Sequence, residues 1–170
     1  EDPITAPVAT TDVPAEEFRQ SRGVSLDETL GSVAGVIAQG RAGSPDVRIT
    51  IRGFGARGAG DRSNAGTTRG VRILLDGFPI TEPDGRTSLD LPDLGTLSHV
   101  RVVRSNSSAL FGSASGGLID LVSSRESDTP FLDWRASFGS FGFQRYQANG
   151  GGPQGSANLR GSASYTSNDG

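Results

Sequence analysis

Three glycines at Gly53, Gly55 and Gly58 have the spacing G-x-G-x-x-G and follow a segment that alternates like a β-strand. In dinucleotide-binding folds this spacing lets the backbone approach a pyrophosphate at the N-terminus of a helix. Asp76 ends the next strand-like segment, near the offset of about 20 residues at which such folds place an acid for the ribose. The pattern raises the hypothesis of a nucleotide-binding enzyme.

The stretch that follows these glycines argues against that hypothesis. Residues 59–70 read AGDRSNAGTTRG, which has no apolar stripe and is rich in residues that disfavour helices. A phosphate-binding turn needs a helix at this point. The chain also has no lysine to complete a P-loop. A nucleotide-dependent enzyme stays an alternative that saturable NAD binding dependent on Gly55 would support.

The sequence also lacks the combinations of side chains that other catalytic or metal-binding sites need. The only histidine is His99, and there is no cysteine with which it could form a zinc site or a nucleophilic pair. Ser113 and Ser115 lie in a GSASGG segment but miss the central position of a nucleophile elbow. We therefore predict that the chain is not an enzyme and has no resident metal or cofactor.

The charge balance gives no indication of nucleic-acid binding. All 16 basic residues are arginines, against 19 acidic residues, for a formal net charge of -3. Nucleic-acid-binding domains usually carry a basic excess on one face. Arginine keeps its charge when partly buried and offers a planar fork to carboxylates. Internal ion pairs and an anionic ligand are both compatible with this composition.

The first part of the chain predicts a small mixed domain that ends near Arg125. After an extended lead-in, we expect a short helix with Pro14 near its first turn. A second helix should start at the S-x-x-E capping box of Ser25 and Glu28 and end near Gly35. Strand-like segments follow at residues 47–52, 71–76, 99–104 and 117–123.

Residues 126–170 have a different sequence pattern, in which polar and apolar residues alternate through three segments. Trp134, Ala136 and Phe138, for example, share one face, whereas Asp133 and Arg135 lie on the other. Segments of about ten residues with this alternation are typical of outer-membrane barrel strands. A sandwich or soluble meander has the same period, so alternation alone leaves both open. Three strands cannot close a barrel, so if these segments are barrel strands we expect this chain to contain only part of one.

Several motifs then resemble one family in a consistent order. VRILLDGFPIT at 71–81 and LSHVRVVRSNSSALFGSASGGLIDLVSS at 97–124 are similar to the plug domain of TonB-dependent outer-membrane receptors. Upstream, SLDETLGSVAGVIAQGR at 25–41 and ITIRGFGAR at 49–57 continue the likeness. The resemblance implies an α+β plug domain over residues 1–125, followed at 126–170 by the first three strands of a transmembrane barrel of about 22 strands.

The family resemblance also implies a function. Such receptors bind a scarce extracellular solute, commonly a ferric siderophore, and import it when TonB in the inner membrane rearranges the plug. We therefore expect a location in the outer membrane of a Gram-negative bacterium, with the N-terminus toward the periplasm. The implied partners are TonB, a ferric siderophore or similar iron chelate, and outer-membrane lipid. The alternative is a receptor-like protein that binds a carbohydrate or protein without TonB-coupled transport.

The same resemblance assigns roles to individual residues. Plug loops would contact an anionic chelate by charge-assisted hydrogen bonds, although each arginine in them could instead pair with a barrel carboxylate. The predicted substrate-binding residues are Arg57, Arg62, Asn64, Arg69, Asp84 and Arg86. Arg52, Arg101 and Arg104 are assigned to packing between plug and barrel, and Gly53, Gly55, Gly58 and Gly77 to loop geometry.

Two departures from the family pattern bear on these assignments. Arg101 stands where the family has a glutamate, which reverses a charge and predicts a complementary acid on the barrel, outside this chain. Ser105 and Asn106 replace a Gly-Pro pair, and Asn tolerates the left-handed backbone such a turn needs. No segment near Glu1 matches the TonB-contacting box convincingly. The reversed charge and the missing box keep the non-transporting alternative open.

Overall fold

The computed structural model describes residues 9–19, 25–41, 44–55, 69–82, 87, 89, 93–123 and 128–169. The chain forms two compact units, Glu1–Ser123 and Ser124–Gly170. The predicted boundary at Arg125 lies outside the described residues.

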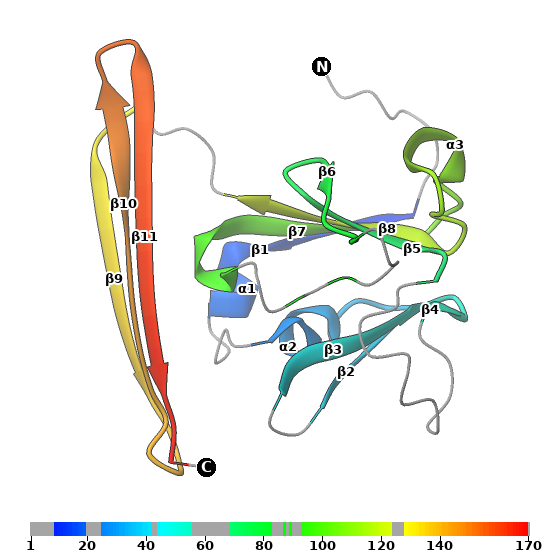
Figure 1. Cartoon of the computed structure of the whole chain (residues 1–170), viewed down its shortest axis with the longest axis horizontal. Coiled ribbons are helices and arrows are strands. Elements are labelled where there is room, and N and C mark those ends of the chain that lie inside the picture. The colour runs from blue at the N-terminus through cyan, green and yellow to red at the C-terminus, as the bar shows by residue number, and fades with distance from the viewer. Residues whose placement is uncertain are drawn as a thin grey trace. The chain divides into compact units, whose positions relative to one another are not determined.

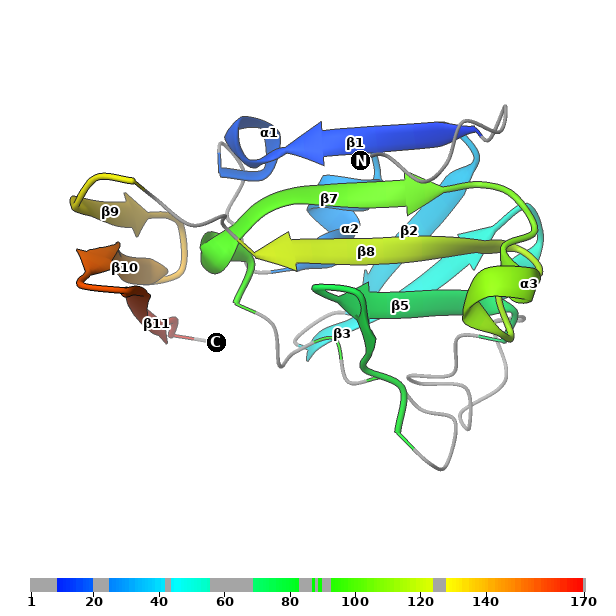
Figure 2. The same ribbon diagram turned by 90° about the horizontal axis from the view of Figure 1, so that it is seen from above.

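A mixed five-stranded sheet forms one layer of the first unit (Figure 1). Its strands are β1 (Thr10–Pro14), β5 (Val71–Leu75), β6 (Phe78–Pro79), β7 (Leu97–Val103) and β8 (Gly117–Ser123). Their order is β1-β7-β8-β5-β6, and Figure 2 shows the first four side by side. Only β5 and β8 are parallel. Three of these strands were predicted, whereas the extended lead-in was not expected to join the sheet.

The opposite layer contains a smaller antiparallel sheet. Its strands are β2 (Val36–Arg41), β3 (Ser44–Ile51) and β4 (Phe54–Gly55), in the order β2-β3-β4. The sequence predicted β3 but not β2. A register shift between Gly40 and Arg41 interrupts the ladder near the end of β2.

The helices of the first unit are short. They are α1 (Ala15–Arg19), α2 (Leu26–Leu30), the 3₁₀ turn η2 (Leu94–Thr96) and α3 (Ser108–Phe111). No helix in the described ranges is both long and apolar enough to cross a membrane. Helix α1 follows Pro14 as predicted.

The predicted extent and capping of α2 are wrong. The helix ends at Leu30 instead of near Gly35, and Ser25, although at its N-cap, makes no side-chain capping bond. Asp27 takes the capping role, because its Oδ1 accepts from the Glu28 N–H at 3.0 Å and its Oδ2 accepts from the Gly40 N–H at 3.1 Å. One carboxylate thus ties the start of α2 to the end of β2.

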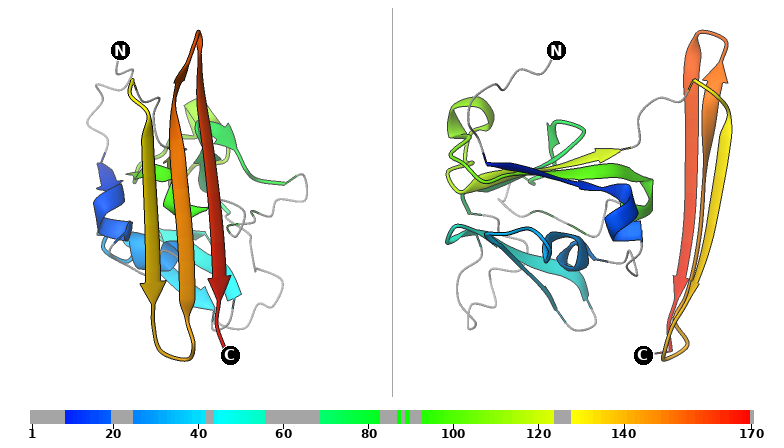
Figure 3. Two further views of the ribbon diagram at one scale, coloured as in Figure 1. Left: turned by 90° about the vertical axis from the view of Figure 1, so that its left-hand side faces the viewer. Right: turned by 180° about the vertical axis from the view of Figure 1, so that it is seen from behind.

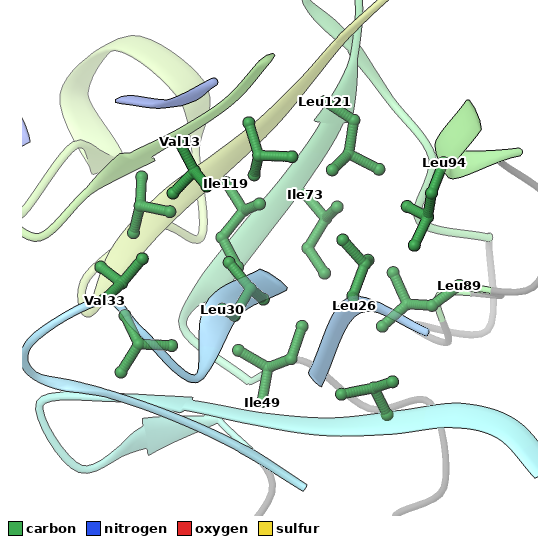
Figure 4. Packing of buried hydrophobic residues seen from close by; sticks show 14 of the residues in the cluster. Val13, Leu26, Leu30, Val33, Ile49, Ile73, Leu89, Leu94, Ile119 and Leu121 are labelled. Atoms are coloured by element: carbon green, nitrogen blue, oxygen red, sulfur yellow. The ribbon is translucent and has the colours of Figure 1, made fainter. Parts of the chain in front are cut away.

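Helix α2 and the two sheets bury the core of the first unit between them (Figure 4). Leu30 of α2, Ile51 of β3, Ile73 of β5 and Ile119 of β8 are fully buried. Burial of each such side chain contributes about 1.5–3 kcal/mol to stability. A smaller cluster on the other face of the five-stranded sheet joins Phe111 of α3 to Leu74, Val103 and Leu118.

The second unit is a three-stranded antiparallel sheet of long strands (Figure 3). Its strands are β9 (Phe131–Phe138), β10 (Gln144–Gln154) and β11 (Ala157–Ser167), with β10 in the centre. The three alternating segments predicted by the sequence are these strands.

Candidate functional site

The glycine-rich segment of the first unit forms a β-hairpin instead of a strand-to-helix turn. Ile51 pairs with Phe54, which leaves Arg52 and Gly53 as a two-residue loop. Both have positive φ, 52° and 81°, as a type I′ turn requires. A side chain at Gly55 would overlap the Ile49 carbonyl oxygen, so this glycine serves close backbone approach. Gly58 lies outside the described residues.

Asp76 and Gly77 form a second hairpin of the same kind. Leu75 pairs with Phe78, and the two loop residues have φ of 51° and 80°. The Asp76 Oδ1 accepts a hydrogen bond of 2.7 Å from the Ser123 N–H, at the end of β8. The Gly77 N–H donates to Asp120 Oδ1 at 3.2 Å. The spacing of Asp76 in the sequence suggested ribose binding. Its carboxylate instead links the β5–β6 turn to the end of β8.

Arg101 finds its complementary acid within the chain. Its Nε lies 2.9 Å from Asp12 Oδ1, and the two residues are register partners across β7 and β1. The expectation that the acid must come from the barrel is therefore wrong. The sequence does not predict this pair, because Asp12 lies in an extended lead-in for which local pattern indicates no strand partner.

Arg104 and Arg52 are engaged within the first unit as well. The Arg104 guanidinium donates to the Ala34 carbonyl and, at 2.9 Å, to Thr11 Oγ1. The Arg52 Nη1 donates to the Arg104 carbonyl at 3.3 Å. These bonds join β1, the turn after α2, and the β3–β4 hairpin. Packing of Arg52, Arg101 and Arg104 against a barrel stays a prediction.

Arg69 differs from these three arginines. It is exposed, and in the described part of the chain no hydrogen bond or ion pair engages its guanidinium. It directly precedes Gly70 and β5. The other predicted substrate-binding residues, Arg57, Arg62, Asn64, Asp84 and Arg86, lie outside the described residues. Among the predicted ligand residues, Arg69 is therefore the one that lies within the described ranges.

The surroundings of Arg69 include an aromatic contact that the sequence did not predict. The Phe54 ring lies against Gly70 and Gly116, and the Gly116 N–H donates to the Gly70 carbonyl at 2.7 Å. The consecutive glycines at 116 and 117 were the available signal, since paired glycines before a strand indicate close approach of another segment. Within the described ranges no group of three or more His, Asp or Glu side chains is arranged to hold a metal ion.

The strands of the second unit present one apolar and one polar face. Tyr146 of β10 pairs with Ala136 of β9 and Tyr165 of β11. In the next row on the same face, Trp134 of β9 pairs with Ala148 of β10. Large apolar side chains on this face are exposed by 43% to 79%. They are Leu132, Trp134, Phe138, Tyr146, Leu159 and Tyr165. An exposed apolar face of this size indicates contact with lipid or with another apolar surface.

The opposite face of this sheet is polar. Asp133, Arg135, Arg145 and Arg160 alternate with the apolar residues and therefore project from it. The Arg160 guanidinium lies 5.1 Å from the centre of the Phe131 ring, a cation–π contact near one end of the strands. Two faces of opposite polarity are what a barrel strand in a membrane requires.

Solved structures share this fold. The ferric yersiniabactin uptake receptor FyuA from Yersinia pestis has a TM-score of 0.67 at 22% identity, over 94% of this chain and 24% of its own. The ferripyoverdine receptor of the outer membrane of Pseudomonas aeruginosa has a TM-score of 0.73 at 17% identity, over 96% and 21%. The ferric preacinetobactin receptor BauA from Acinetobacter baumannii has a TM-score of 0.71 at 20% identity, over 95% and 23%. The chain thus spans less than a quarter of each of these structures.

The family itself follows from the sequence profile of the TonB-dependent Receptor Plug Domain, which matches residues 2–118. This match covers most of the first unit, including both hairpins and the sheet as far as the start of β8. The second unit follows the plug as the first strands of a barrel. The chain therefore belongs to the family of TonB-dependent receptor plug domains.

Proposed function

We propose that this chain is the plug and adjoining strands of an outer-membrane receptor that binds a scarce extracellular iron chelate and imports it by TonB-driven plug rearrangement. The family match and the ferric siderophore receptors of similar fold support this proposal. The N-terminus would face the periplasm. The iron chelate is the transported ligand and not a resident cofactor.

The observation that carries the membrane part of the proposal is the apolar face of the second unit. Trp134 and Leu132 are 79% and 77% exposed in this sheet. Removing apolar surface from water stabilises a protein by about 25 cal/mol per Å². Contact of this face with lipid would therefore stabilise the sheet, whereas exposure of the same face to water would not. In a membrane each strand edge must also be paired, as it is in a closed barrel.

Arginines supply the proposed recognition of the ligand. Guanidinium groups form short, charge-assisted and often bidentate hydrogen bonds to carboxylates. Arg69 is exposed and unengaged in the described structure, whereas Arg52, Arg101 and Arg104 bind groups of the plug. This supports the proposal that Arg69 contacts the ligand. The family resemblance alone proposes Arg57, Arg62 and Arg86 for the same site.

The ligand proposal is tested with the full-length receptor in detergent. Calorimetric titration with ferric citrate, several ferric siderophores, heme and cobalamin should identify one ferric chelate that binds tightly. Arg69→Ala should weaken that binding. Binding of none of the iron chelates, with binding of a polysaccharide or a protein instead, would contradict this function and favour a receptor without iron transport.

The TonB proposal needs a separate uptake experiment in cells. Deleting the TonB-contacting segment of the full-length protein should abolish uptake of the bound chelate while leaving its binding intact. Unchanged uptake would contradict energy coupling through TonB. The charge reversal at Arg101 no longer argues against a coupled receptor, because Asp12 neutralises it within the plug.

A further inference from the structure

The ring of Phe54 lies in a socket formed by two glycines, Gly70 and Gly116. A Cβ on Gly116 would overlap the Phe54 Cβ and lie 2.7 Å from its Cγ. A Cβ on Gly70 would lie 2.9 Å from the ring carbon Cδ1. Only glycine at both positions leaves room for the ring. We call this arrangement of Phe54, Gly70 and Gly116 the glycine socket.

The glycine socket brings three distant segments together. Phe54 belongs to β4, Gly70 directly precedes β5, and Gly116 lies just before β8. The Gly116 N–H donates to the Gly70 carbonyl at 2.7 Å. Gly70 also has a φ of +74°, which a residue with a side chain adopts only with strain. Gly70, the residue after Arg69, is thus held both by a hydrogen bond to its carbonyl and by an aromatic contact at its Cα.

We infer that the glycine socket positions Arg69, and that Phe54 is a positioning residue of the ligand site. This inference rests on the proposed function, which places Arg69 against an anionic ferric chelate. The direction of a long side chain follows from the backbone that carries it. A guanidinium makes two hydrogen bonds to a carboxylate only when the two groups are at the right distance and lie in one plane. Small movements of the backbone that carries the arginine therefore reduce the number of these hydrogen bonds. The ligand class that depends most on this positioning is a ferric polycarboxylate.

Phe78 provides a matched control for Phe54. Both phenylalanines follow a two-residue turn whose second residue is glycine, Gly53 in one hairpin and Gly77 in the other. Phe78 is 75% exposed, whereas Phe54 is 38% exposed because of the glycine socket. Truncation of Phe78 therefore removes a ring at an equivalent hairpin position without emptying the socket.

The test is calorimetric binding of ferric citrate to the full-length receptor in detergent. We expect Arg69→Ala to weaken binding about tenfold, as for loss of one charge-assisted contact. Phe54→Ala should weaken it by a similar factor. The double variant should bind no more than about twofold more weakly than Arg69→Ala, because Phe54 acts through Arg69. Phe54→Tyr, which keeps the ring, and Phe78→Ala should stay within about twofold of the wild type.

A second measurement tests the packing of the glycine socket without any ligand. Gly116→Ala should lower the melting temperature strongly, since its methyl group overlaps Phe54. In a Phe54→Gly background the same substitution should cost much less, because both the Cβ and the ring that the new methyl group overlaps are gone. Equal costs of Gly116→Ala in both backgrounds would overturn the socket.

The outcomes separate this inference from the function on which it rests. If Arg69→Ala weakens binding but Phe54→Ala does not, the inference is overturned and the proposed function stands. Additive losses in the double variant also overturn it, since Phe54 would then act independently of Arg69. If the wild-type receptor binds neither ferric citrate nor any other ferric chelate, the proposed function fails, and the role of Arg69 fails with it.

Discussion

Asp12 and Arg101 form an ion pair across β1 and β7, with Asp12 Oδ1 2.9 Å from Arg101 Nε. Their side chains are 50% and 41% exposed, so solvent screens the pair. On the other side of Arg101, in β8, its register partner is Asp120. A guanidinium therefore stands in a row between two carboxylates from neighbouring strands. This arrangement neutralises the Arg101 guanidinium within the first unit.

The first prediction concerns this ion pair. Asp12→Asn should lower the free energy of unfolding by about 0.2–1 kcal/mol, the range of exposed pairs. Asp12→Arg should cost more, because it places two guanidinium groups opposite each other. Adding Arg101→Asp should recover only part of the loss, since the new acid would face Asp120. Urea unfolding measures each value, with exposed Arg69→Ala as a control, and full recovery would show that Asp120 has no influence.

The second prediction concerns Asp76, whose carboxylate accepts from the Ser123 N–H. Asp76→Ala should lower the free energy of unfolding by about 1–2 kcal/mol, because it removes the acceptor and places alanine at positive φ. Asp76→Asn keeps an acceptor oxygen and tolerates the same backbone, so it should cost clearly less. Chemical denaturation of both variants provides the comparison. Equal losses would contradict both reasons, because asparagine keeps an acceptor oxygen and tolerates the positive φ.

The third prediction separates backbone strain from steric overlap in the β3–β4 hairpin. Gly53 has a φ of +81° and open space around it, so Gly53→Ala should cost about 1–2 kcal/mol from strain alone. Gly55 has a φ of +116°, and a Cβ there would also overlap the Ile49 carbonyl. Gly55→Ala should therefore be the more destabilising change by thermal unfolding. The reverse order would contradict the close approach of β4 to β3.

The fourth prediction tests the two faces of the second unit. Trp134→Arg should reduce the stability of the full-length protein in lipid by about 2–4 kcal/mol, if this position lies near the bilayer centre. Asp133→Arg, at the adjacent position on the polar face, should cost much less. Unfolding from lipid vesicles, followed by the loss of heat-modifiable mobility on gels, measures both. A larger cost for Asp133→Arg would mean that the faces are assigned the wrong way round.

Local patterns in the sequence predicted many of the elements. Regular alternation indicated β9, β10 and β11, and strand-like runs indicated β3, β5, β7 and β8. Strand β1 and strand β2 were missed because short, irregular segments become strands only when a neighbouring strand pairs with them. The predicted capping box is wrong for a similar reason. Asp27 accepts a hydrogen bond from Gly40 of β2, and no local sequence pattern indicates that contact.

The sequence by itself determined the family, the polarity of the last three strands and the residue types available for binding an anion. These features depend on the order and period of neighbouring residues, which can be read directly. The tertiary structure decided which arginines are already engaged and which one remains exposed. Asp12 and Arg101, and Asp76 and Ser123, meet only because β1, β7, β8 and β5 lie side by side in one sheet. Phe54 and Gly116 meet because β4, a strand of the smaller sheet, lies against the segment that precedes β8. Strand order joins residues that are far apart in the chain, and that order is a property of the whole fold.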